Sequence, residues 1–77
     1  MILDQIQTAR HRYMEENGKS PVEIVMDEHT ADLLRIACNK SMAKGQRLEK
    51  PEQMFGGLIF GMTIKRWPRN EKGFAVR

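Results

Sequence analysis

The sequence has few of the residues that build disulfides and metal centres. It contains one cysteine, Cys38, and two histidines, His11 and His29, among 77 residues. A single cysteine excludes a disulfide within the chain, and so few scattered ligands argue against a structural zinc site. We expect Cys38, on a predicted helix, to be a small buried apolar residue in a reducing compartment. The sequence therefore predicts no metal and no cofactor.

Long apolar segments and a targeting signal are also lacking. The longest nearly uncharged run, residues 54–64, is far shorter than the roughly 20 residues that a transmembrane helix needs. The first residues include Asp4 and no basic cluster, unlike a signal peptide. We therefore expect a soluble, cytoplasmic protein without membrane contact.

The patterns typical of enzymes are missing as well. Asp27, Glu28 and Asp32 lie at the start of a predicted helix. The helix dipole favours acidic side chains there, so we interpret them as capping residues rather than as a catalytic pair. The Gly-rich stretch 56–61 is followed by a strand pattern and not by the helix that a phosphate-binding loop requires. The sequence predicts a non-enzymatic protein.

The length and charge of the chain indicate one domain that meets a partner. We expect a single domain over residues 1–77, and a chain of this size buries only roughly 60% of its unfolded surface, so oligomerisation would add stability. Residues 1–43 carry five Lys/Arg and seven Asp/Glu, net −2, whereas residues 44–77 carry eight and three, net +5. This difference indicates an anionic or acidic partner for the second half, or it sets the polarity with which subunits meet.

Apolar residues at helical spacing predict two helices. The first covers about residues 3–16 and ends at Asn17-Gly18, a common terminator. The second follows Asp27, a natural N-cap, and runs from Glu28 to about Lys40 or Met42. Each helix has an apolar face, which we expect to cover a sheet.

Alternating apolar and polar residues predict the strands. Residues 22–26 form a short central strand, and residues 62–67 form the main strand. Glycines interrupt the preceding segment, so we expect a short strand or turn at residues 58–60 and then a kink. Pro68 ends the main strand, and the chain is expected to return through residues 74–76 as the second arm of a hairpin.

Residues 43–53 lack any period and are highly charged, with Leu48 as their only large apolar side chain. We expect a long, exposed, mobile loop, and the first candidate for a segment that a partner orders. The predicted fold class is therefore α+β, in the order α-β-α-loop-β-β, with two helices packed on a small antiparallel or mixed sheet.

Two groups of residues are candidates for function. Aromatic groups carry most interface energy, so the first is a set of interface or core contacts, namely Phe55, Leu58, Phe60 and Trp67. The second is a basic and aromatic cluster on the predicted hairpin 65–72, made of Lys65, Arg66, Trp67, Arg69 and Lys72. Its cations would contact the phosphates of a nucleic acid while the Trp67 indole stacks on bases.

The basic cluster also has a purely structural interpretation. Its charges would then solvate an edge strand and protect it from aggregation, while Trp67 packs on the domain. A net charge of +3 is modest for a nucleic-acid-binding domain. We therefore predict protein–protein contact and self-association as the function, with nucleic-acid binding as the alternative.

Three short motifs between residues 22 and 76 lie in a characteristic order. They are Val-Glu-Ile-Val-Met-Asp-Glu-His-Thr-Ala-Asp-Leu-Leu at 22–34, Leu-Ile-Phe-Gly-Met-Thr-Ile at 58–64, and Pro68 followed by Lys-Gly-Phe-Ala-Val at 72–76. This order resembles the strand-helix-loop-hairpin segment of the major capsid proteins of tailed phages. The resemblance implies a small phage or prophage structural or accessory protein, in the host cytoplasm or the virion, whose partners are copies of itself and phage structural or assembly proteins.

Overall fold

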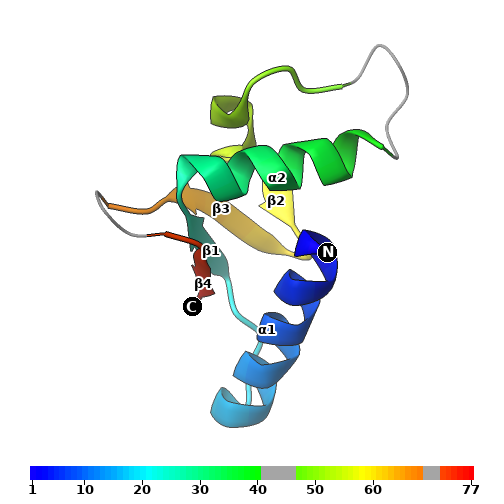
Figure 1. Cartoon of the computed structure of the whole chain (residues 1–77). Helices are drawn as coiled ribbons and strands as arrows, with labels where there is room; N and C mark the ends of the chain where they lie inside the picture. Colours follow the sequence, from blue (N-terminus) through cyan, green and yellow to red (C-terminus); the bar gives the residue numbers. More distant parts are fainter. Residues whose placement is uncertain (41–46, 69–71) are drawn as a thin grey trace.

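The chain folds around a four-stranded sheet that carries helices on one face (Figure 1). The computed structural model describes residues 1–40, 47–68 and 72–77. The elements follow in the order α1 (Ile2–Asn17), β1 (Glu23–Met26), α2 (Glu28–Asn39), the 3-10 helix η2 (Pro51–Met54), β2 (Leu58–Ile59), β3 (Met62–Arg66) and β4 (Phe74–Val76). The predicted α+β class, with two helices on a mixed sheet, is confirmed.

The strands lie in the order β2-β3-β1-β4, with β1 parallel to β3 and antiparallel to β4. A parallel pair needs a crossover connection, and here the chain leaves β1 through α2 and returns through η2 and β2. The predicted hairpin over residues 65–72 is wrong, because β4 pairs with β1 and not with β3. β3 occupies one edge of β1, and β4 occupies the other edge, where the backbone N–H and C=O groups of β1 would otherwise lack partners in the sheet.

The core lies between the sheet and the helices. Ile6 of α1, Leu34 of α2 and Met54 of η2 meet the side chains of β1 and β3 there. Ile6 is the one buried residue of α1, and the C-terminal half of that helix runs past the end of the sheet (Figure 1). The fully buried side chains are Ile6, Ile24, Met26, Leu34, Met62 and Ile64.

Gly18 ends α1, and Asp27 caps the start of α2. Gly18 follows α1 with φ 69°, a left-handed conformation that glycine adopts without steric cost. Asp27 precedes α2, and its Oδ1 accepts a hydrogen bond from the Thr30 backbone N–H at 3.2 Å. Both predicted helix boundaries are thus confirmed to within a residue, except that Met42 lies outside the described residues.

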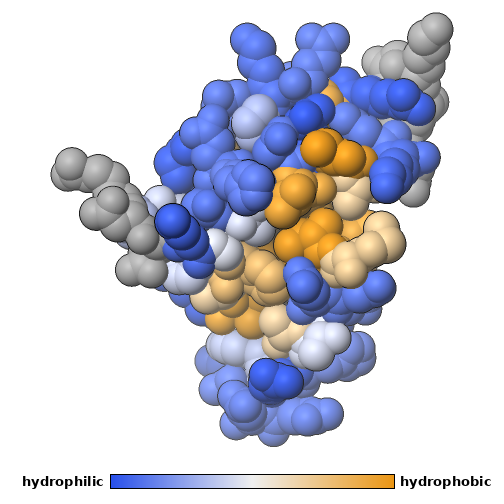
Figure 2. Space-filling model, in the orientation of Figure 1, coloured by the Kyte–Doolittle hydropathy of each residue, from blue (hydrophilic) through white to orange (hydrophobic). Residues whose placement is uncertain are grey.

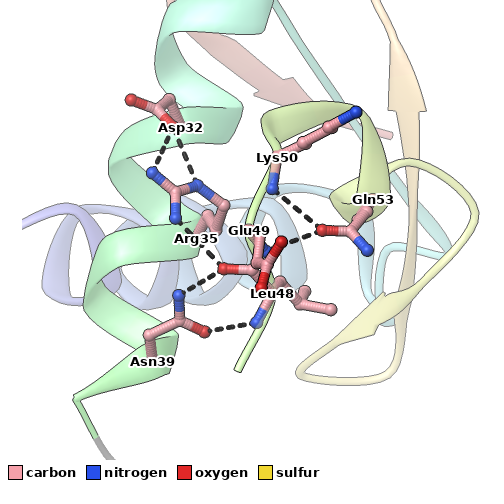
Figure 3. Close-up of polar contacts among 7 residues, drawn as sticks. All are labelled: Asp32, Arg35, Asn39, Leu48, Glu49, Lys50 and Gln53. Carbon is pink, nitrogen blue, oxygen red and sulfur yellow. Dashed lines mark hydrogen bonds and ion pairs between the residues drawn. The ribbon is translucent and has the colours of Figure 1, made fainter. Parts of the chain in front are cut away.

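The described part of the predicted loop 43–53 is ordered by the chain itself. Leu48 packs against the core, and η2 lies along α2. The Gln53 Oε1 accepts hydrogen bonds from the backbone N–H groups of Glu49 and Lys50, at 2.7 and 2.8 Å (Figure 3). The expectation of an irregular loop is therefore wrong for residues 51–53, which belong to η2, because internal hydrogen bonds and one apolar side chain give this segment a defined conformation.

The Asn39 side chain joins α2 to this segment through a pair of hydrogen bonds. Its Nδ2 donates to the Leu48 carbonyl oxygen at 2.7 Å, and its Oδ1 accepts from the Leu48 N–H at 3.0 Å (Figure 3). We expect Asn39→Ala to lower the free energy of unfolding by about 1–2 kcal/mol, since two partly buried groups lose their partner. In the Asn39→Ala protein, amide hydrogen exchange at Leu48 should be faster than in the wild type, and this increase should be larger than any increase in β1.

Asn17→Ala is the matched control for this change. The Asn17 amide makes one exposed bond, from Nδ2 to the Tyr13 carbonyl oxygen at 3.0 Å, so its loss should change stability by less than about 0.5 kcal/mol. Unchanged exchange at Leu48 in the Asn39→Ala protein would show that this pair of bonds does not hold the segment.

Candidate functional site

The cations of the predicted basic cluster do not converge on one surface. Neighbouring residues of a strand point to opposite faces of the sheet, and Lys65 and Arg66 do so in β3. Lys65 forms an ion pair with Glu23 of β1 on the face without helices. Arg66 instead lies 4.3 Å from the centroid of the Phe55 ring, with its Nη1 3.8 Å from Glu28 Oε2. Each cation already has a carboxylate partner.

The rest of the cluster lies farther along the chain. Trp67 is half-buried, and its backbone N–H donates to the Met26 carbonyl oxygen at 2.9 Å. Lys72 is exposed before β4, and Arg69 lies outside the described residues. The structure thus offers no continuous basic surface among the described members of the cluster, because the alternation of β3 separates Lys65 from Arg66.

Glu23 balances two cations on the open face of the sheet. Its carboxylate pairs with Lys65 and with Arg77, whose Nε lies 3.0 Å from Glu23 Oε1. The hydrogen bond from Lys65 is the largest cause that lowers the pKa of Glu23 below its ordinary value, and the hydrogen bond from Arg77 is the second. The carboxylate therefore stays charged in the folded protein and neutralises part of the positive charge on this face.

The four predicted contact residues divide into two pairs. Phe55 packs against the core beneath Arg66, and Trp67 is half-buried. Leu58 and Phe60 are 73% and 37% exposed, respectively, at the β2 end of the sheet. Leu58 and Phe60 are therefore the exposed members of the set, and Phe55 and Trp67 are partly buried.

Phe60 and Gly61 form the tight turn between β2 and β3. Ile59 pairs with Met62 across a two-residue loop, in which φ is 49° at Phe60 and 81° at Gly61. Positive φ at both positions is typical of the type I′ hairpin turn, where Asn or Gly is preferred at the first position. Among the described residues, Phe60 is the one non-glycine with positive φ. An aromatic side chain in this conformation costs about 1 kcal/mol or more.

A second exposed apolar surface lies on the outer side of α2. Leu33 and Ile36 are 45% and 44% exposed, and Figure 2 shows apolar atoms gathered over α2 and the start of α1. They border an open groove of about 250 Å³ between the two helices. The groove is lined by Met1, Ile2, Gln5, Leu33, Ile36, Ala37 and Lys40.

The sequence analysis missed this surface because it expected the apolar face of the second helix to cover the sheet. A signal was present in the pattern. Helix α2 has a buried stripe that includes Ala31 and Leu34, and Leu33 and Ile36 add apolar groups on another side. An apolar surface wider than one sheet-facing stripe indicates a second contact.

Comparison with known protein families, curated proteins and solved structures finds no match to this chain. Within residues 1–40, 47–68 and 72–77, no three or more His, Cys, Asp or Glu side chains are grouped so that they could hold a metal ion. In the same part of the chain, no helix has the length and apolar character needed to cross a membrane. Cys38 packs against the core, and burial raises the pKa of its thiol.

Proposed function

We propose that this chain is a non-enzymatic structural or accessory protein, of the tailed-phage or prophage type, that acts through protein–protein contact and self-association. The observation that carries this proposal is the exposure of large apolar side chains at two places outside the core, the β2–β3 turn and the outer side of α2. Apolar surface of this kind on a small domain is typical of a binding site.

The β2–β3 turn supports the proposal through its conformation. Phe60 occupies a position where Asn or Gly would form the same turn at lower cost, and its ring is partly in solvent instead of in the core. Leu58, two residues earlier, is more exposed still. Strained backbone conformations are concentrated at functional sites, so the strain at Phe60 supports a role of its side chain in contact with a partner.

The ion pairs of β3 favour a protein partner over a nucleic acid. Binding of a phosphate backbone requires cations that are free to replace counterions. Lys65 and Arg66 are instead matched by Glu23 and Glu28. Nucleic-acid binding through residues 65–72 therefore remains the second candidate.

Light scattering behind size exclusion distinguishes the two functions. We expect an oligomer that resists high salt and that, after nuclease treatment, has the 260/280 nm absorbance ratio of protein alone. A monomer that retains nucleic acid at low salt and releases it at high salt would overturn the proposal, because that behaviour is typical of phosphate contacts.

Phe60→Asn separates the stability of the turn from its contact role. We expect the free energy of unfolding to rise by about 1 kcal/mol, since Asn adopts the left-handed conformation more readily. Binding at this turn should become weaker, because the ring is lost. Chemical denaturation measures the change in the free energy of unfolding. Sedimentation of the protein alone, or mixed with capsid and assembly proteins of the same phage, measures the change in binding.

Val22→Asn is the control, because Val22 is 68% exposed and lies outside this turn. It should not raise stability. If Phe60→Asn does not stabilise the protein, the turn carries no strain. If all binding survives in Phe60→Asn, the turn does not contribute to the contact.

A further inference from the structure

We propose that the outer face of α2 packs against the same face of a second copy of this chain, as an antiparallel helix pair related by a two-fold axis. The proposal rests on the self-association proposed above and names its surface. The surface is the α2 stripe, defined as His29, Leu33, Ile36 and Lys40.

The α2 stripe has the spacing of a helix-pairing seam. Its members follow one another at intervals of four, three and four residues, the pattern by which successive side chains of a coiled coil face a partner helix. All of its members are exposed, whereas Ala31, Leu34 and Ala37 face the core. The apolar pair Leu33 and Ile36 lies in the middle of the stripe, with a polar residue at each end. A partner helix would therefore bury the apolar centre and leave the ends at the rim.

The stripe is complementary to itself when the second helix is reversed. A two-fold axis between residues 34 and 35 brings Leu33 of one copy against Ile36 of the other, twice. The same axis brings His29 of one copy against Lys40 of the other, so every member of the stripe meets another member. A surface that pairs with itself in this way is what an isologous dimer requires.

The charges along α2 favour the reversed orientation. Glu28 and Asp32 lie in its N-terminal half, where Glu28 is 3.8 Å from Arg66 and Asp32 pairs with Arg35, and the exposed Lys40 follows the last residue of the helix. Reversal brings the Lys40 ammonium of one copy to the acidic end of the other, near Glu28, and aligns the two helix dipoles in opposite directions. A parallel pair would place the acidic ends together. The opposed helix dipoles and the separation of the two acidic ends thus favour the antiparallel arrangement.

The start of α1 supplies the additional area that a stable dimer needs. A typical interface covers roughly 800 Å² of each partner, about a seventh of the 5377 Å² surface of this chain. One stripe of a short helix is smaller than this. Met1, 73% exposed, and Ile2 continue the apolar surface on the far side of the groove. The groove gives the second copy room to seat its side chains.

Disulfide formation between cysteine variants tests the register. In a full chain that also carries Cys38→Ser, we expect Leu33→Cys protein to cross-link with Ile36→Cys protein about tenfold faster than either cross-links with itself, under diamide oxidation. A parallel pair would instead cross-link each variant with itself. Equal, slow rates for all three combinations would also overturn the proposal.

A double substitution tests the surface. We expect Leu33→Asp with Ile36→Asp to weaken self-association by roughly 100-fold in sedimentation equilibrium, while circular dichroism shows an intact fold because both side chains are already half-exposed. Val22→Asp, at a position that is 68% exposed and lies outside both surfaces, is the matched control, and Leu58→Asp tests the β2–β3 turn as the competing surface. If the double variant still self-associates and Leu58→Asp does not, α2 is not the dimer surface but the proposed self-association stands. A wild-type chain that is monomeric at all concentrations overturns both.

Discussion

Ile24→Ala is expected to lower the free energy of unfolding by about 3–4 kcal/mol, because a fully buried side chain is cut back in the middle of the sheet. Ile24 is aligned with Ile64 of β3 on one side and with Val76 of β4 on the other. The cavity would thus open where three strands meet the helices. A domain of this size has a total stability of about 4–12 kcal/mol, so one substitution removes a large share of it.

Urea denaturation followed by circular dichroism measures this loss. Ile24→Val, which removes one methylene group, should cost about 1 kcal/mol, and Val22→Ala at an exposed neighbouring position should cost less than about 0.5 kcal/mol. Equal losses for Ile24→Ala and Val22→Ala would mean that β1 is not the centre of the core. Self-association of the Ile24→Ala protein should be tested well below its denaturation midpoint, so that unfolding is not mistaken for loss of contact.

Local patterns in the sequence were sufficient to predict the elements. The glycine after α1, the carboxylate before α2 and the alternation in β3 act over a few residues, and each is found where it was expected. The central position of β1 was also predictable, because Ile24, Val25 and Met26 are consecutive apolar residues.

The connections between distant segments were not predictable in this way. A hairpin was expected because β3 and β4 follow one another in the chain, but β4 pairs with a strand about fifty residues earlier. The hydrogen bonds between Asn39 and Leu48 likewise depend on η2 returning to α2. Such contacts depend on the whole fold, and no local propensity encodes them.

The candidate sites show the same division. Leu58 and Phe60 were selected from the sequence as members of an aromatic and apolar set of interface or core contacts, but only the structure shows that they are exposed while Phe55 is packed against the core. The alternation that separates Lys65 from Arg66 was visible in the sequence, whereas their carboxylate partners come from β1 and α2. Charge counted along the chain therefore did not show that each of these two cations lies beside a carboxylate.

Asp27→Ala is expected to lower the free energy of unfolding by about 2–3 kcal/mol at neutral pH, because one carboxylate serves two parts of the fold. Its Oδ1 accepts from the Thr30 N–H at the start of α2 and from the Gly73 N–H at the start of β4, both at 3.2 Å. The loss combines an N-cap worth about 1 kcal/mol, a hydrogen bond worth about 1 kcal/mol, and a favourable charge at the helix N-terminus.

The same contacts make this contribution depend on pH. Hydrogen bonding by the Thr30 side chain is the largest cause that lowers the pKa of Asp27 below its usual value of 3.8, and the backbone N–H groups of Thr30 and Gly73 add to it. Because the pKa is lower in the folded state, the stabilisation is fully present above pH of about 4 and is lost as the pH falls through the folded-state pKa. Denaturation curves between pH 7 and pH 2 would measure this change.

Asp27→Asn isolates the charge from the cap. Asparagine also accepts the Thr30 and Gly73 hydrogen bonds, so at neutral pH this variant should be more stable than Asp27→Ala and less stable than the wild type. As the pH falls below about 4, the difference between Asp27→Asn and the wild type should shrink, because the wild-type carboxyl becomes neutral as well. A constant difference down to pH 2 would mean that the charge of Asp27 does not hold the start of α2 against the start of β4, and that shape and hydrogen bonding alone join these two segments.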